Sequence, residues 1–249
     1  MDVRGNVRVE TGQKRVRVMF GGTVVADTIE PLLVWEKPYY PTYYFRTGEA
    51  RMDLFMPTDD VERSSSRGEA QRLSVVVGDR RAEGAVTHCG SSPIPELSDT
   101  VAFDWAAMDH WFEEDEEVFV HARDPYKRID ALHSSRHVRF EVDGIDVADS
   151  VRPVILFETG LPARFYLPKI DVRMEMLVPT SSSTACPYKG TARYWNVVVG
   201  GTVHEDLAWG YDAPLSESAP IAGLISFYNE RVDIRVDGVR VERPRTVFG

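Results

Sequence analysis

The sequence has few cysteines, few lysines and no long apolar run. Its two cysteines, Cys89 and Cys186, are too few for a disulfide framework or a four-thiolate zinc site, and they fit a reducing cytosol. No stretch approaches the roughly 18 uncharged apolar residues that a membrane-spanning helix needs. The first eight residues contain no apolar run, so we expect no secretory signal. These absences predict a cytoplasmic protein that does not contact a membrane.

The net charge of the chain narrows the range of expected binding partners. Lysine and arginine together number 29 against 39 aspartates and glutamates, which gives a net charge of −10. A field of that sign repels phosphate backbones, so no nucleic-acid partner is expected. Of the 29 basic residues, 24 are arginines. They could recognise anions through two parallel hydrogen bonds, but ion pairs on the surface are the more ordinary interpretation.

The chain repeats itself with an offset of 122 residues. Residues 16–36, 51–58 and 67–78 align with 138–158, 173–180 and 189–200, and 18 of the 41 aligned pairs are identical. Unrelated segments of ordinary composition would share about 2 or 3. The sequence therefore predicts a duplicated module, with an N-terminal unit over residues 1–130 and a C-terminal unit over residues 131–249.

Both units show the alternation of strands. Residues 15–20 alternate, turn at Gly21-Gly22 and resume over 23–26, and the equivalent hairpin turns at Asp143-Gly144. A third hairpin is expected over residues 232–241, and short buried strands over 32–35 and 154–157. Helical signals are limited to a turn or two within 104–112 and 221–228. We therefore predict an all-β protein of two small antiparallel barrels or sandwiches in tandem.

One segment carries a family resemblance. Residues 184–195 read TACPYKGTARYW, and this block, with the flanking segments 158–168 and 222–230, closely resembles the family known as domain of unknown function 427. Residues 111–116, WFEEDE, are similar to the tandem members of that family. The resemblance covers nearly the whole chain. It implies a β-tent-like fold in a bacterial or fungal protein, and it implies no settled activity.

The N-terminal unit departs from this pattern. Where the C-terminal unit has Cys-Pro-Tyr-Lys-Gly at 186–190, the same offset places Ser-Ser-Ser-Arg-Gly at 64–68. The glycine is retained and the thiol is not. We therefore interpret the N-terminal unit as a degenerate copy and expect the site in the C-terminal unit or between the two.

Cys186 and Lys189 are the candidate catalytic residues. An ammonium group near a thiol favours the thiolate, which is the nucleophilic form. No histidine is close in sequence, so a base such as His204 would have to be supplied by the fold. The alternative is a structural cysteine in a loop held by Pro187 and Gly190.

Five further residues are candidates for ligand binding: Glu158, Arg164, Tyr166, Tyr188 and Trp195. Aromatic walls with a few converging polar groups are typical of small-molecule sites. For the aromatic residues the alternative is that they fill the core. For Glu158 it is a structural carboxylate, since Glu36 repeats it in the first unit.

Three functions remain open from the sequence. The first is binding of a small anionic or aromatic metabolite in the C-terminal unit, with Lys189 and Arg164 pairing its charge. The second is a Cys186-dependent transferase or hydrolase, and the third is a non-catalytic interaction module. No cofactor is expected and no metal site, because the histidines lack paired metal-ligand spacing. A homo-oligomer is compatible with all three.

Overall fold

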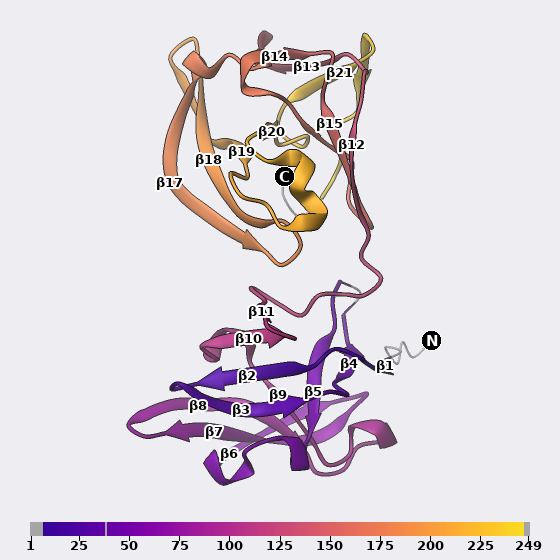
Figure 1. Cartoon of the computed structure of the whole chain (residues 1–249), viewed down its shortest axis with the longest axis vertical. Helices are drawn as coiled ribbons and strands as arrows, with labels where there is room; N and C mark the ends of the chain where they lie inside the picture. The colour runs from indigo at the N-terminus through magenta and orange to yellow at the C-terminus, as the bar shows by residue number, and fades with distance from the viewer. Residues whose placement is uncertain (1–6, 38, 247–249) are drawn as a thin grey trace. The chain divides into compact units, whose positions relative to one another are not determined.

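The computed structural model describes residues 7–37 and 39–246. The chain forms two compact units, residues 1–124 and 125–249, coloured indigo to magenta and rose to yellow in Figure 1. The division lies at the Asp124-Pro125 step, six residues before the expected boundary between 130 and 131. Each unit has its own hydrophobic core, as a duplicated module requires.

The first unit consists of two antiparallel sheets. The larger sheet contains, in spatial order, β1 (Arg8–Thr11), β4 (Leu32–Trp35), β5 (Thr42–Arg46), β9 (Thr100–Phe103), β8 (Arg80–Cys89), β7 (Gly68–Val77) and β6 (Phe55–Ser64). The smaller sheet contains β11 (Glu116–Glu117), β10 (His110–Glu113), β2 (Val16–Phe20) and β3 (Thr23–Thr28). Short 3-10 turns connect them: η1 (Thr47–Glu49), η2 (Met52–Leu54), η3 (Pro95–Leu97) and η4 (Trp105–Ala107).

The second unit repeats this arrangement. Its first sheet contains β12 (Ile129–His133), β15 (Val154–Glu158) and β16 (Arg164–Tyr166), and its second contains β20 (Ile225–Phe227), β19 (Thr202–Gly210), β18 (Gly190–Val199) and β17 (Leu177–Cys186). The third sheet contains β14 (Ile145–Ser150), β13 (Val138–Val142), β21 (Asp233–Val236) and β22 (Val239–Val241). Its 3-10 turns are η5 (Lys169–Asp171), η6 (Met174–Met176) and η7 (Ser216–Ile221). The backbones of Leu167 and Ile225 exchange hydrogen bonds of 2.8 and 2.9 Å, which join the first two sheets in the strand order of the first unit.

The fold is all-β, as predicted, and the sheets of each unit pack as a sandwich. Successive residues of a strand point to opposite faces. On β8, Val86 therefore faces the core between the two sheets, while Thr87 faces the other side of the larger sheet. That second face carries a smaller apolar cluster, which includes Tyr44, Cys89 and Ala102. The three predicted hairpins are confirmed as β2–β3, β13–β14 and β21–β22.

Of the two expected helical turns, the first is confirmed and the second needs correction. Within 104–112, η4 forms one turn and the segment then continues as strand β10. Within 221–228 the turn ends at Ile221, and residues 225–227 form strand β20 because they pair with β19. In residues 7–37 and 39–246, no helix has the length and apolar character needed to span a bilayer.

Candidate functional site

Each unit forms an ion pair at the same two positions of the repeat. In the second unit the Lys189 ammonium lies 2.5 Å from the Glu158 carboxylate, and the two side chains are 13% and 8% exposed. In the first unit Nε of Arg67 lies 2.9 Å from Oε2 of Glu36, and Arg67 is 9% exposed. The offset of 122 relates the cations to each other and the carboxylates to each other. The degenerate bend has therefore lost its thiol and kept its cation.

A tyrosine lies beside each of these pairs. In the first unit Arg67 donates a hydrogen bond of 2.8 Å to the Tyr44 hydroxyl, which donates in turn to Glu36 at 3.3 Å. Tyr166 occupies the equivalent position and accepts a hydrogen bond of 3.2 Å from the Trp209 indole. Burial raises the pKa of both tyrosines, so both hydroxyls stay protonated.

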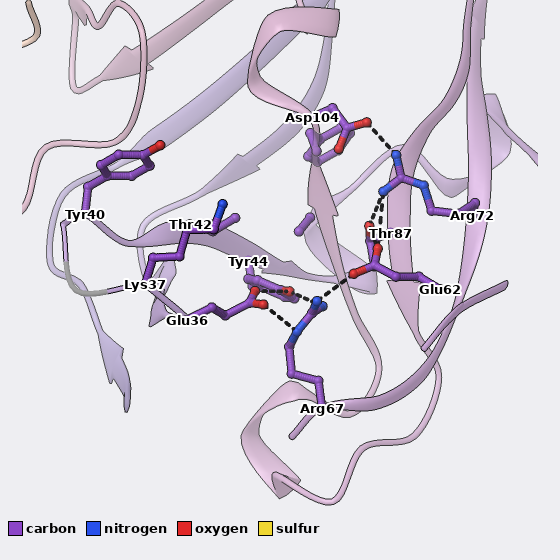
Figure 2. Close-up of a pocket in the computed structure, with 12 residues that line it drawn as sticks. Glu36, Lys37, Tyr40, Thr42, Tyr44, Glu62, Arg67, Arg72, Thr87 and Asp104 are labelled. Atoms are coloured by element: carbon purple, nitrogen blue, oxygen red, sulfur yellow. Dashed lines mark hydrogen bonds and ion pairs between the residues drawn. The ribbon is translucent and has the colours of Figure 1, made fainter. Parts of the chain in front are cut away.

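A polar cavity of about 290 Å³ opens beside the ion pair of the first unit, on the second face of the larger sheet. Figure 2 shows its side chains converging from β5, β6, β7 and β8. It is lined by Glu36, Lys37, Tyr40, Thr42, Tyr44, Glu62, Arg67, Arg72, Thr87, Ala102, Phe103 and Asp104. We call it the first-unit cavity.

A chain of charged hydrogen bonds crosses this cavity (Figure 2). Arg67 donates to Glu62 at 2.6 Å, and Glu62 accepts a second bond from the Thr87 hydroxyl at 3.2 Å. Arg72 donates to Thr87 and to Asp104, both at 2.5 Å. Burial alone would raise the pKa of Glu62, but the bond from Arg67 and the nearby arginine charges outweigh it and hold that pKa below its usual range. The carboxylate is therefore ionised at neutral pH.

The second unit has neutral side chains at these four positions. The offset, and for the last position the pairing of β20 with β19, places Thr184, Tyr194, Trp209 and Tyr228 where the first unit has Glu62, Arg72, Thr87 and Asp104. In the first unit the Arg72 guanidinium lies 3.6 Å from the Glu62 carboxylate. The equivalent residues of the second unit, Thr184 and Tyr194, share a hydrogen bond of 2.7 Å. Trp209 and Tyr228 pack with ring centroids 4.5 Å apart. Uncharged and aromatic groups thus replace the charged network of the first unit.

Three of these four residues, Thr184, Tyr194 and Tyr228, line a hollow of about 440 Å³ in the second unit. It is lined by Ser182, Ser183, Thr184, Tyr194, Asp206, Tyr228 and Arg231. The Asp206 carboxylate is occupied by the hydroxyls of Thr180 and Ser182, at 2.7 and 2.6 Å. Neither Cys186 nor Lys189 lines this hollow.

The candidate catalytic residues lie on one bend, and each has neighbours of its own. Cys186 ends β17, is half-buried and pairs with Gly190 across the hairpin. Lys189 is held by Glu158. His204, the base considered for the thiol, lies instead 2.9 Å from the Asp143 carboxylate.

The candidate ligand-binding residues are divided among several environments. Arg164 forms two hydrogen bonds of 2.7 Å with Glu230, and the two side chains are 9% and 2% exposed. Tyr166 and Tyr188 are buried, and Trp195 packs against the core between the sheets. None of these side chains lines the first-unit cavity or the hollow of the second unit.

Residues that sequence reasoning missed lie in the first unit: Glu62, Arg67, Arg72, Thr87 and Asp104. The signal was present in the repeat. When the two copies are compared for charge and not only for identity, Glu62 and Arg72 align with uncharged residues of the second copy. Within the described residues, no group of three histidines, cysteines or carboxylates is arranged to hold a metal ion.

Comparison with known families gives one match. The family described as a domain of unknown function, DUF427, matches the chain twice, over residues 8–114 and 130–238. No curated protein matches it.

Proposed function

Because the chain belongs to this family, in the tandem two-domain form, and the family's description names no activity, we propose a function from the geometry: the protein binds a small polar molecule in the first-unit cavity. Small-molecule sites combine a concave volume with a few polar groups that are held in place before the ligand arrives. The first-unit cavity has both features.

One observation carries the proposal. Both units keep the same strands and the equivalent ion pair, yet only the second places Trp209 and two tyrosines over this face. Thr87 in the first unit leaves the volume open and uses its hydroxyl to connect Glu62 with Arg72. The second unit forms the same strands with uncharged residues at these positions, so the fold of the module does not require the charged network.

The binding of an anionic or aromatic metabolite in the second unit stays a second proposal. The hollow bounded by Tyr194, Tyr228 and Arg231 favours it, because it combines two aromatic rings with a cation. Lys189 is less suited to an anion than the sequence suggested, because Glu158 already neutralises it.

Thr87→Trp tests the first-unit site. The substitution copies the residue that the second unit carries at the same strand position, so we expect it to fill the cavity without unfolding the chain. A panel of small polar metabolites is screened by ligand-observed NMR on the full chain, and hits are titrated. We expect affinity for the hits to fall at least about tenfold in the variant.

Thr202→Trp is the matched control, since Thr202 is exposed and lies outside both hollows. This variant should bind the hits as the wild type does. Hits that bind Thr87→Trp unchanged would place their site elsewhere and overturn the proposal.

A further inference from the structure

We infer that the first-unit cavity selects a small ligand that carries an ammonium group. This inference rests on the proposed function and adds the chemical class of the ligand. It depends on which charged groups the cavity presents, on whether the arginines are free, and on the field of the whole unit.

The charged side chains of the lining cancel in number but differ in exposure. Arg67 and Arg72 are 9% and 19% exposed, whereas the carboxylate side chains of Glu36, Glu62 and Asp104 are 30%, 36% and 55% exposed. The arginines thus lie behind the carboxylates. The third cation of the lining, Lys37, is exposed, so a molecule entering the cavity meets three carboxylates, which only accept hydrogen bonds, and one ammonium group.

The arginines are also already occupied. Arg67 bonds to Tyr44 and Glu62 and lies within ion-pair distance of Glu36. Arg72 bonds to Thr87 and Asp104. An anionic ligand would have to displace these carboxylates from buried cations, which is costly because the displaced charges would lose their partners. A cationic ligand can instead bind to lone pairs of the carboxylates that the arginines leave free, so no existing ion pair is broken.

The field of the first unit has the sign that attracts such a ligand. Residues 1–124 contain 14 lysines and arginines against 23 aspartates and glutamates, a net charge of −9. Residues 125–249 contain 15 against 16, a net charge of −1. The negative charge of the protein is therefore concentrated in the unit that has the cavity. Such a field raises the local concentration of small cations.

One of the three aromatic side chains of the lining extends this picture. Tyr40 is exposed and stacked on His121, with ring centroids 3.9 Å apart, whereas Tyr44 is buried and Phe103 packs into the core between the sheets. The faces of such rings carry partial negative charge and attract an ammonium group. Carboxylates with aromatic neighbours suit an amine on a short carbon chain.

Three four-carbon probes separate charge from size: butane-1,4-diamine, butane-1,4-diol and succinate. Each is titrated into the full isotope-labelled chain, and backbone amide shifts of β5, β7 and β8 are followed. We expect saturable shifts with the diamine, binding at least about tenfold weaker with the diol, and none with succinate. Equal or tighter binding of the diol or of succinate would overturn the inference, as would a diamine that causes no shift.

Two variants connect the preference to the carboxylates. Asp104→Asn and Glu62→Gln keep the shape of the side chain and remove its charge, and each should weaken diamine binding about tenfold. Asp104 is more exposed than Glu62, so we expect Asp104→Asn to stay folded and to provide the test even if Glu62→Gln unfolds. The control Glu96→Gln, on the exposed turn η3 outside the cavity, should bind normally.

Thr87→Trp separates the two proposals. If succinate or the diol binds best and this variant abolishes that binding, the cavity is a site and only the ligand class is wrong. If diamine binding is the same in Thr87→Trp as in the wild type, the cavity is not the site and both proposals fail.

Discussion

At the scale of single residues, the buried charges of the second unit are arranged as ion pairs. Glu230 is 2% exposed and receives both hydrogen bonds of the Arg164 guanidinium. Burial by itself raises the pKa of Glu230, but the bonds from Arg164 and Thr246 outweigh this and leave the pKa below its usual value. Glu158 is nearly as buried and depends on Lys189. These residues act first as structural ion pairs.

Lys189→Met should destabilise the second unit. The substitution keeps the length of the side chain and leaves the Glu158 carboxylate buried without its cation, which typically costs about 3–5 kcal/mol. Urea denaturation of the full chain, followed by tryptophan fluorescence, measures the change.

Lys169→Met is the control, because Lys169 is exposed on η5 and should change the unfolding free energy by less than about 0.5 kcal/mol. Equal stability of the two variants would show that the pair with Glu158 contributes nothing to the fold.

At the scale of elements, paired bulges shape the long hairpins of both units. The register shifts between Pro57 and Val61 on β6 and between Pro179 and Ser183 on β17, at equivalent positions of the repeat. Bulges bend a strand and increase its twist. The bent strands of the second unit are visible in Figure 1 as the curved ribbons β17 and β18. The bends were not predicted, since alternation alone gives no sign of them.

Gly210→Ala should disrupt the pairing of β19 with β20. Gly210 lies opposite Ile225, and a methyl group there would overlap the carbonyl oxygen of Leu224, which is backbone and cannot rotate away. We expect a loss of about 1–3 kcal/mol, measured by urea denaturation.

Gly48→Ala makes the same change where no atom lies within 4 Å and should leave stability nearly unchanged. A Gly210→Ala protein as stable as this control would contradict the prediction, because β19 and β20 could then move apart at Gly210 without loss of stability.

At the scale of the whole molecule, folding favours the ionised form of several carboxylates in each unit. Among them are Glu62 in the first unit and Glu230 in the second, both with a pKa below the usual range. When folding lowers a carboxyl pKa, the unfolded chain binds the proton more tightly. The resulting stability is complete above the unfolded pKa of about 4.3 and is lost as the pH falls through the folded value.

Acid should therefore destabilise both units. Urea denaturation at pH 7, 5, 4 and 3 should show little change between the first two values and a progressive fall below about pH 4.3. The variant Glu230→Gln should show a smaller fall. A free energy of unfolding that stays constant down to pH 3 would contradict the assigned shifts.

The sequence predicted the fold better than the site. Alternating residues and turn dipeptides located the three hairpins, because the side-chain period of a strand is a local property. The roles of Cys186 and Lys189 stay predictions. The sequence placed them near each other, but Lys189 faces Glu158, which is 31 residues away along the chain.

The sequence by itself determined that one all-β module occurs twice, because identities at a constant offset and strand periodicity need no knowledge of neighbours in space. Only the tertiary structure decided where a cavity could form. Whether a charged side chain is paired or faces an opening depends on residues from other strands, and here that depends on Thr87 in one copy and Trp209 in the other. Packing between distant segments, and not any local motif, separates the charged cavity of the first unit from the aromatic hollow of the second.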